Sequence, residues 1–300
     1  MKTLTFPPLA VAPTGALGFA VRFVRGAVER LPQIRRDTKA GTESGPKQGR
    51  IALIGAGPGA KDLLTLRAVQ RIGEADVVFY DRLVDDAVLA YARPGAELVF
   101  VGKHVGNHSW PQERINAVIV DAAQAGRRVV RLKSGDPGVF GRAGEEIAAA
   151  NAHGIPVEII PGVTAVCAAA ASMGQSLTER GIADILVLAT GMGQKGDPLP
   201  ASARMSGPGT TTAFYMSVGQ AARIAAALMA RGLPADAPVS VAVEVSKPEE
   251  RAHHGTLAGL PALIAENAVT GCAIVLVTWP KTPEAPEAPA VTRAAAQVTG

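Results

Sequence analysis

The segment from Arg127 to His153 constrains the fold more than any other part of the 300-residue chain. Its pattern predicts a strand over Arg127–Leu132, a tight turn over Gly135–Gly138 and a helix over Ala143–His153. Pro137 restricts the shape of the turn. Ligands of open α/β sheets bind where strands give way to loops, so we expect a binding site at this Gly-Asp-Pro turn. An ordinary glycine-containing loop would show the same local pattern.

Composition predicts a folded chain with a substantial core, because 48% of its residues are hydrophobic. Cys167 and Cys272 are its two cysteines, and we expect both to be buried packing residues rather than parts of a disulfide framework or a metal site. No uninterrupted apolar run reaches the roughly 20 residues of a membrane span, and no signal-peptide pattern is seen at the start. The expectation is a cytoplasmic protein that does not associate with a membrane.

Positive charge is concentrated at the start of the chain. The first 50 residues contain nine Lys or Arg against three Asp or Glu, so residues 51–300 carry −2 of the total charge of +4. This distribution argues against a nucleic-acid partner and predicts that any anionic ligand is held by a few placed arginines. We expect residues 1–49 to form a partly disordered basic arm and linker, with a targeting or docking role as an alternative, and residues 282–300 to form a disordered tail.

Between these arms, apolar strands alternate with helical segments as far as Ile160, which predicts a largely parallel sheet. Beyond Thr164, strands follow one another more often, which is typical of a mixed α+β domain. The predicted fold is therefore α/β, with domains at residues 50–165 and 166–281 and an active-site cleft between them. The predicted strands are Ile51–Ile54, Val77–Tyr80, Glu97–Val101, Arg128–Leu132, Val157–Ile160, Ile185–Ala189, Thr210–Met216, Pro238–Val245, His253–Thr256 and Cys272–Thr278. The predicted helices are Leu63–Ile72, Asp85–Ala92, Gln112–Ala125, Ala143–His153, Val218–Arg231 and Leu257–Glu266.

The first strand runs into Gly55–Ala60 (GAGPGA), which fits the loose dinucleotide pattern G-x-G-x-x-A. A nicotinamide-dependent oxidoreductase is therefore one reading. Pro58 weakens it, since proline has no N–H to offer a pyrophosphate, and so does a helix that we expect to begin only after Asp62, its predicted N-cap. A purely structural turn is the other alternative.

Ionisable residues follow the second and third predicted strands, where active sites of such sheets gather. Asp81 is a reasonable proton acceptor and Lys103 a reasonable acid, although a surface ion pair or a helix cap would explain each one singly. Arg142 and Glu145 share a face at the start of a helix. We favour a functional role for Glu145 and, for Glu146, a first-turn acid that complements the helix dipole.

No histidine has metal-ligand spacing with a carboxylate or a cysteine, so no metal is expected. The chain also lacks a G-x-S-x-G elbow and a Ser/His/Asp order, so hydrolase chemistry has little support.

With these motifs in view, the chain resembles the tetrapyrrole methyltransferase family and, within it, the uroporphyrinogen-III C-methyltransferases. The resemblance extends from about Gly49 to Lys281. It rests on several long motifs in the right order: Ile54–Gly59, Asp62–Ala68, Tyr80–Val84, Val101–Lys103, Gln112–Asn116, Arg131–Glu146, Ile160–Ala165 and Tyr215–Met216.

The resemblance implies a two-domain tetrapyrrole methylase-like fold that binds S-adenosyl-L-methionine as methyl donor. The implied cofactor-binding residues are Pro58, Ser134, Gly135, Asp136, Val139, Thr164, Ala165, Met216 and Val245. It also implies methylation of C2 and C7 of uroporphyrinogen III, giving precorrin-2 for sirohaem, cobalamin or haem d1 synthesis. The implied catalytic residues are Asp81, Lys103 and Glu145. A homodimer is expected by analogy with the family.

The implied substrate-binding residues are Arg82, Arg142, Arg180 and Met192. A substrate with eight carboxylates suits bidentate arginines in a domain of nearly neutral charge. Met192 stands where the family has a histidine after Thr-Gly. Ser134 and Ala143 each replace a glycine of the family pattern, and Gly138 replaces an aromatic residue. Another tetrapyrrole acceptor and a non-catalytic tetrapyrrole-binding paralogue therefore remain alternatives.

Overall fold

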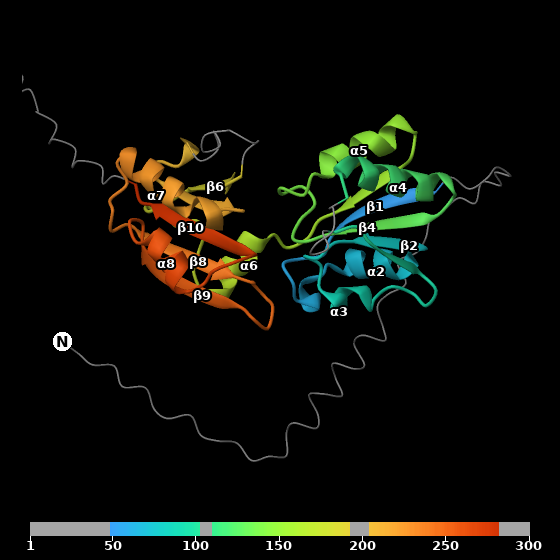
Figure 1. Cartoon of the computed structure of the whole chain (residues 1–300), viewed down its shortest axis with the longest axis horizontal. Coiled ribbons are helices and arrows are strands. Elements are labelled where there is room, and N and C mark those ends of the chain that lie inside the picture. Colours follow the sequence, from blue (N-terminus) through green and yellow to red (C-terminus); the bar gives the residue numbers. More distant parts are fainter. Residues whose placement is uncertain (1–48, 103–109, 193–203, 282–300) are drawn as a thin grey trace, which may run out of the picture. The chain divides into compact units, whose positions relative to one another are not determined.

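The computed structural model describes residues 49–102, 110–192 and 204–281 (Figure 1). Its first half holds a five-stranded, fully parallel sheet of order β3-β2-β4-β1-β5. The strands are β1 (Arg50–Gly55), β2 (Val77–Tyr80), β3 (Glu97–Phe100), β4 (Arg128–Lys133) and β5 (Val157–Ile160). The helical segments are η1 (Lys61–Leu63), α2 (Leu66–Glu74), α3 (Asp86–Leu89), α4 (Gln112–Gln124) and α5 (Ala143–Ala152).

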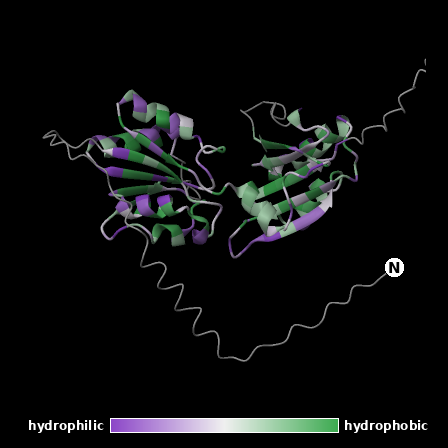
Figure 2. Ribbon diagram, turned by 180° about the vertical axis from the view of Figure 1, so that it is seen from behind, coloured by the Kyte–Doolittle hydropathy of each residue, from purple (hydrophilic) through white to green (hydrophobic). Residues whose placement is uncertain are grey.

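Helices cover both faces of this sheet, as Figure 1 shows. Ile51 and Leu53 of β1 belong to the apolar cluster that includes α4 and α5, whereas Ala52 and Ile54 belong to the cluster that includes α2 and α3. Successive strand residues point to opposite faces, so a sheet buried on both sides needs apolar residues at nearly every position. The hydrophobic strands in Figure 2 reflect this requirement.

The second sheet also has five strands, in the order β6-β7-β10-β8-β9. Only β6 and β7 pair in parallel among them, and the other three pairs are antiparallel. The strands are β6 (Ile185–Thr190), β7 (Thr210–Tyr215), β8 (Pro238–Val243), β9 (Arg251–Thr256) and β10 (Ala273–Trp279). The helical segments are α6 (Ala165–Ser172), η3 (Val218–Gln220), α7 (Ala221–Ala230) and α8 (Leu260–Glu266). α7 and α8 share one core cluster with the sheet, while α6 packs on residues of the other face.

The predicted fold class is confirmed: a parallel sheet with helices is followed by a mixed one. Both sheets belong to one compact unit, Pro46–Gly300, so the division into domains at residue 165 stays a prediction. The arm and tail lie outside the described residues, apart from Gly49. No helix in the described ranges is long and apolar enough to cross a membrane.

Three local predictions were wrong. Helix α6 was not predicted, because its alanine-rich sequence has no apolar period and the helix is specified by packing. Asp62 does not cap a helix, since the turn η1 intervenes and Thr65 accepts the hydrogen bond of the Ala68 N–H instead (3.2 Å). The cysteines are not buried: Cys167 is exposed on α6, and Cys272 is half-buried.

Asp76 precedes β2 and binds two arginines through its carboxylate. Its carboxylate accepts hydrogen bonds from the Arg128 guanidinium (2.8 Å), the Arg128 backbone N–H (2.7 Å) and the Arg93 guanidinium (2.7 Å). Arg128 above all, with Arg93, holds the pKa of Asp76 well below its usual range against the opposing effect of burial.

Asp76→Asn is expected to lower the free energy of unfolding at pH 7 by about 1–2 kcal/mol. A carboxyl group whose pKa is lower in the folded state than in the unfolded state stabilises the fold at pH values above its unfolded pKa. This stabilisation is lost as the pH falls toward the folded-state pKa. The difference from the wild type should therefore shrink below about pH 4. Urea unfolding at pH 7 and pH 3 measures this, with the exposed Asp121→Asn as control. A difference independent of pH would contradict the assignment.

Candidate active site

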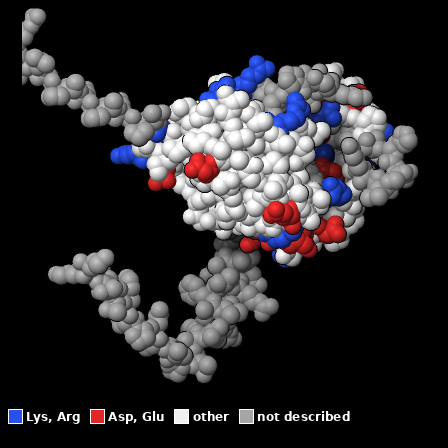
Figure 3. Space-filling view, turned by 60° about the vertical axis from the view of Figure 1, so that its left-hand side comes forward, with Lys and Arg blue, Asp and Glu red and all other residues white. Residues whose placement is uncertain are grey.

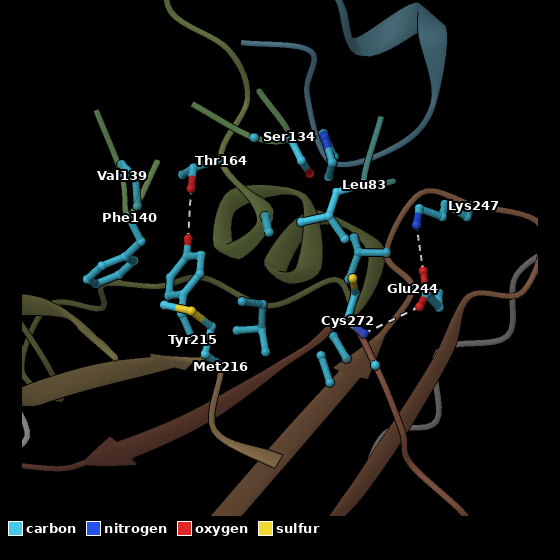
Figure 4. Close-up of a pocket in the computed structure, with 18 of the residues that line it drawn as sticks. Leu83, Ser134, Val139, Phe140, Thr164, Tyr215, Met216, Glu244, Lys247 and Cys272 are labelled. Carbon is cyan, nitrogen blue, oxygen red and sulfur yellow. Dashed lines mark hydrogen bonds and ion pairs between the residues drawn. The ribbon is translucent and has the colours of Figure 1, made fainter. Parts of the chain in front are cut away.

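A pocket of about 350 Å³ lies at the carboxyl ends of the strands of the first sheet and is closed by residues from the second. This volume falls within the range of ~300–1,000 Å³ typical of small-molecule sites. The first half of the chain contributes Pro58, Arg82, Leu83, Ser134, Gly135, Asp136, Val139, Phe140 and Thr164. Helix α6 and the second sheet contribute Ala165, Tyr215, Met216, Ala242, Glu244, Val245, Lys247, Gly271, Cys272, Ala273 and Ile274 (Figure 4).

Three glycines allow the loops after β1, β4 and β5 to meet beside the pocket. A Cβ on Gly55 would lie 2.5 Å from the Gly162 nitrogen and 2.7 Å from the Gly135 oxygen. The backbones therefore pass too closely for any side chain at this crossing. Gly57 and Gly135 exchange two backbone hydrogen bonds, of 3.2 Å and 2.7 Å, which tie the β1 and β4 loops together.

Three backbone N–H groups of the Gly55–Ala60 loop donate hydrogen bonds within the protein. The Ala56 N–H donates to the Lys133 carbonyl (2.8 Å), that of Gly57 to Gly135 (3.2 Å) and that of Ala60 to the Ser246 hydroxyl (3.0 Å). Pro58 has no N–H. A pyrophosphate cradle needs free N–H groups, so these contacts weigh against the nicotinamide interpretation of the motif.

Asp136 organises the loop that the sequence singled out. One carboxylate oxygen accepts a hydrogen bond from the Gly138 N–H (2.7 Å), and the other accepts one from the Gly162 N–H (3.0 Å). The side chain thus joins the β4–α5 loop to the β5–α6 loop, and both loops line the pocket.

One part of the pocket is aromatic. The Tyr215 hydroxyl bonds with the Thr164 hydroxyl (2.7 Å) and accepts a hydrogen bond from the Val166 N–H (3.2 Å), and the Tyr215 ring lies 5.0 Å from that of Phe140. Burial raises the pKa of Tyr215, so its phenol is neutral at physiological pH. Figure 4 shows Met216 next to this pair.

Another part of the pocket is charged. Lys247 pairs with Glu244 (2.6 Å), which also accepts a long hydrogen bond from the Cys272 N–H (3.4 Å). Burial alone would raise the pKa of Glu244, but Lys247, the Cys272 N–H and the charge of Arg82 together hold it below its ordinary value. The pKa of the Cys272 thiol is raised by its own burial and by Glu244.

Unusual backbone conformations are concentrated here. Phe140, Met216 and Glu244 line the pocket with φ of 54°, 51° and 48°, and Arg142 and Ser246 lie close to it in chain with φ of 55° and 62°. Positive φ is uncommon outside glycine and persists where the surrounding structure enforces it, typically at functional sites.

A buried ionic network, which we call the Arg131 network, lies under α4 and α5. Arg131 and Lys133 project from β4 and are each 5% exposed, and Glu146 of α5 is 4% exposed. Glu146 bonds with Lys133 (2.8 Å) and more weakly with Arg131 (3.4 Å), which also pairs with Asp81 (2.9 Å). Burial lowers the pKa of Lys133, as does Arg131, with Glu146 opposing both. Glu146 is, as predicted, an acid in the first turn of α5, but its side chain is buried in this network, which the sequence did not indicate.

The structure brings all the predicted cofactor-binding residues to the wall of this one pocket, together with Arg82. Asp81 precedes Arg82 but does not itself line the pocket. Arg142 and Glu145 form an exposed ion pair (2.7 Å) at the start of α5. Arg180 is exposed in the turn before β6, and Met192 is 61% exposed beside Gly191, which hydrogen-bonds with Tyr215. Lys103 lies outside the described residues. The assigned roles stay predictions.

The site predictions did not include Phe140, Tyr215, Glu244, Lys247 and Cys272. Tyr215 carried a signal, since it is a polar aromatic residue at the end of an apolar strand. Glu244 carried none, because the strand was predicted to continue to Val245, and nothing in the sequence indicates the left-handed φ that ends it at Val243.

Charge is scattered on the described part of the face in Figure 3, where Lys and Arg side chains and Asp and Glu side chains surround a mostly uncharged area. No broad basic field is seen on this described part of the face, and the binding of an anionic ligand by a few placed arginines stays a prediction.

Comparison with known proteins agrees with this geometry. Residues 50–261 match the family model of tetrapyrrole (corrin/porphyrin) methylases. The siroheme synthase of Gluconacetobacter diazotrophicus is 43% identical over 254 residues, which are 84% of this chain and 53% of that protein. That of Chromobacterium violaceum is 40% identical over 263 residues, 88% of this chain and 55% of that protein. The chain thus spans about half the length of the curated relatives it matches.

Solved structures that resemble this chain are also tetrapyrrole methyltransferases. Uroporphyrin-III C-methyl transferase from Thermus thermophilus, complexed with S-adenyl homocysteine, is 38% identical with a TM-score of 0.64, covering 76% of this chain and 92% of that one. A cobalt precorrin-4 methyltransferase is 28% identical with a TM-score of 0.69, covering 80% and 98%. With the family model matched over most of its described residues, the chain belongs to the tetrapyrrole (corrin/porphyrin) methylase family.

Proposed function

We propose that this tetrapyrrole methylase transfers methyl groups from S-adenosyl-L-methionine to C2 and C7 of uroporphyrinogen III, yielding precorrin-2. The observation that carries the proposal is the convergence of every residue implied for the donor on a single pocket. The similar Thermus thermophilus enzyme, named for this substrate and complexed with S-adenyl homocysteine, supports it.

The pocket residues fit the donor chemically. Phe140, Tyr215 and Met216 offer aromatic and thioether surface suited to a purine, while polar and charged groups such as Ser134 and Glu244 suit ribose and amino-acid groups. When bound, the donor supplies an electrophilic sulfonium methyl. The chain's own contribution is to hold donor and acceptor in alignment and to exclude competing water.

Arginines near the pocket are suited to the acceptor's carboxylates. Arg82 lines the pocket, and Arg142 stands at the end of the same loop that carries Val139 and Phe140. Arg142 is held by Glu145 through two hydrogen bonds of 2.7 Å, so its guanidinium is positioned at the surface before an anion arrives. Asp81, next to the pocket-lining Arg82, is the proposed acceptor of a proton as the ring rearranges after methylation.

Anaerobic incubation with uroporphyrinogen III and methyl-labelled donor tests the proposal, with product mass and label counted. The wild type should add two methyl groups. Asp81→Ala and Arg142→Ala should each slow transfer by ~10- to 100-fold, because one removes the proposed base and the other a proposed substrate contact. Arg223→Ala, an exposed arginine of α7, should have no effect.

The other outcomes separate the remaining alternatives. One added methyl group would indicate an altered acceptor site, with Met192 the first position to restore to histidine. Binding of S-adenosylhomocysteine without transfer would favour another tetrapyrrole acceptor or a carrier role. Tight NADH binding without affinity for S-adenosylhomocysteine would support the oxidoreductase reading and contradict the proposal. The homodimer remains a prediction, to be measured by light scattering.

A further inference from the structure

Arg131 contacts the residue that the proposed function makes the base. Its Nη2 donates to Asp81 Oδ2 at 2.9 Å, although the two residues are 50 positions apart in the chain. The other carboxylate oxygen of Asp81 accepts a hydrogen bond from the Leu83 N–H (3.0 Å), and Leu83 lines the pocket. The plane of the Asp81 carboxylate is therefore held at both oxygens, each of which keeps lone-pair capacity.

Arg131 is itself held from the protein interior. Glu146 accepts a weak contact from its Nε (3.4 Å), and Glu146 is in turn held by Lys133 (2.8 and 2.9 Å) and by the Gln112 amide (3.3 Å). Two cations and two carboxylates balance in charge. Burying such a network costs desolvation free energy, which is offset only where each charged group has an ion-pair or hydrogen-bond partner.

We infer that Arg131, anchored by Glu146, is a positioning residue that holds Asp81 in the orientation required for proton abstraction. The inference rests on the proposed function, since it assigns Asp81 the role of base. The planar guanidinium has donors on both sides, so it can reach Asp81 and Glu146 at once. The ammonium of a lysine at the same position lacks this fork, which makes Arg131→Lys an informative variant.

Arg131→Met and Arg131→Lys are compared with Asp81→Asn and with the double variant Arg131→Met/Asp81→Asn, using methyl transfer to uroporphyrinogen III. Arg131→Met should lower kcat by about 100-fold, the scale expected when a reacting group is misplaced by about 1 Å. KM and the Kd of S-adenosylhomocysteine should change little. Arg131→Lys should recover part of kcat. Arg71→Met, which breaks the Arg71–Glu158 ion pair of the same half, serves as control and should keep full activity.

The double variant separates positioning from a general structural role. If Arg131 acts through Asp81, Arg131→Met should cause no further loss of kcat in the Asp81→Asn background. Additive losses, or an equal loss of S-adenosylhomocysteine binding, would overturn the inference. If Arg131→Met does not fold, Arg131→Lys, which keeps the positive charge beside Asp81 and Glu146, replaces it in the cycle.

Failure of the proposed function gives a different result. If the wild type binds S-adenosylhomocysteine but does not methylate uroporphyrinogen III, the choice of acceptor is wrong. The coupling between Arg131 and Asp81 is then measured by urea unfolding of the wild type, Arg131→Met, Asp81→Asn and the double variant. Non-additive midpoints support a direct Arg131–Asp81 coupling, and additive midpoints overturn it.

Discussion

Glu146→Ala is expected to destabilise the folded chain by about 3–5 kcal/mol, the usual cost of leaving a buried charge without its partner. Lys133 would lose its carboxylate partner while 5% exposed, and Arg131 would lose one of two. The loss exceeds the value of the ion pair itself, because the desolvated ammonium is left without compensation. Urea unfolding at pH 7 measures it as a lower midpoint.

Glu145→Ala is the matched control, since it changes the preceding acid of the same helix. Glu145 is exposed and pairs only with the exposed Arg142 among the described residues, so its unfolding midpoint should stay close to that of the wild type. Glu146→Gln should be intermediate, because the amide still accepts a hydrogen bond. Equal midpoints for the two alanine variants would show that the Arg131 network does not stabilise the fold.

Gly55→Ala is expected to destabilise the chain by about 3 kcal/mol and to weaken S-adenosylhomocysteine binding by at least ~10-fold. The new Cβ would lie 2.5 Å from the Gly162 nitrogen and 2.6 Å from its Cα, and backbone atoms cannot move aside as a flexible side chain can. Separating the loops after β1 and β5 displaces Thr164 and Gly135, which line the pocket. Calorimetric titration and urea unfolding measure the two effects.

Gly144→Ala provides a control of opposite sign. Gly144 lies in α5, and an added Cβ would meet nothing within 4 Å, so alanine should raise stability slightly through its helix propensity. Binding of S-adenosylhomocysteine should be unchanged. If Gly55→Ala also left stability and S-adenosylhomocysteine binding intact, the inference that the three loops pass too closely for a side chain at residue 55 would be wrong.

Much of the first sheet was predictable. Val77–Tyr80 and Val157–Ile160 were predicted with the bounds that β2 and β5 have, and the ends of the other three strands of this sheet were placed within one residue. Strands buried on both faces are short apolar runs, and polar turns separate them clearly from helices. The Gly-Asp-Pro loop was identified for the same reason. The residues implied for the cofactor came from the family resemblance rather than from periodicity, and the structure places them around one pocket, while their role stays a prediction.

Adjacent acids on one helix mark the limit of this reasoning. Glu145 and Glu146 are both glutamates in the first turn of α5. Glu145 is nevertheless exposed, whereas Glu146 lies at the centre of a buried network. Helix geometry turns successive residues by about 100°, and only the elements packed against α5 determine which of them faces inward. The same applies to α6, whose alanines are apolar on every face.

Local pattern alone therefore predicted the alternation of strands and helices, the glycine-rich loops at strand ends and the carboxyl ends of the strands as the place where the pocket lies. Folding in three dimensions established the rest: the strand order, the pairing of Arg131 with Asp81 across 50 residues and the left-handed Glu244 that brings a carboxylate to the pocket. Periodicity reports which face of an element is apolar. It contains no information on which distant element covers that face or which buried charges must be paired there.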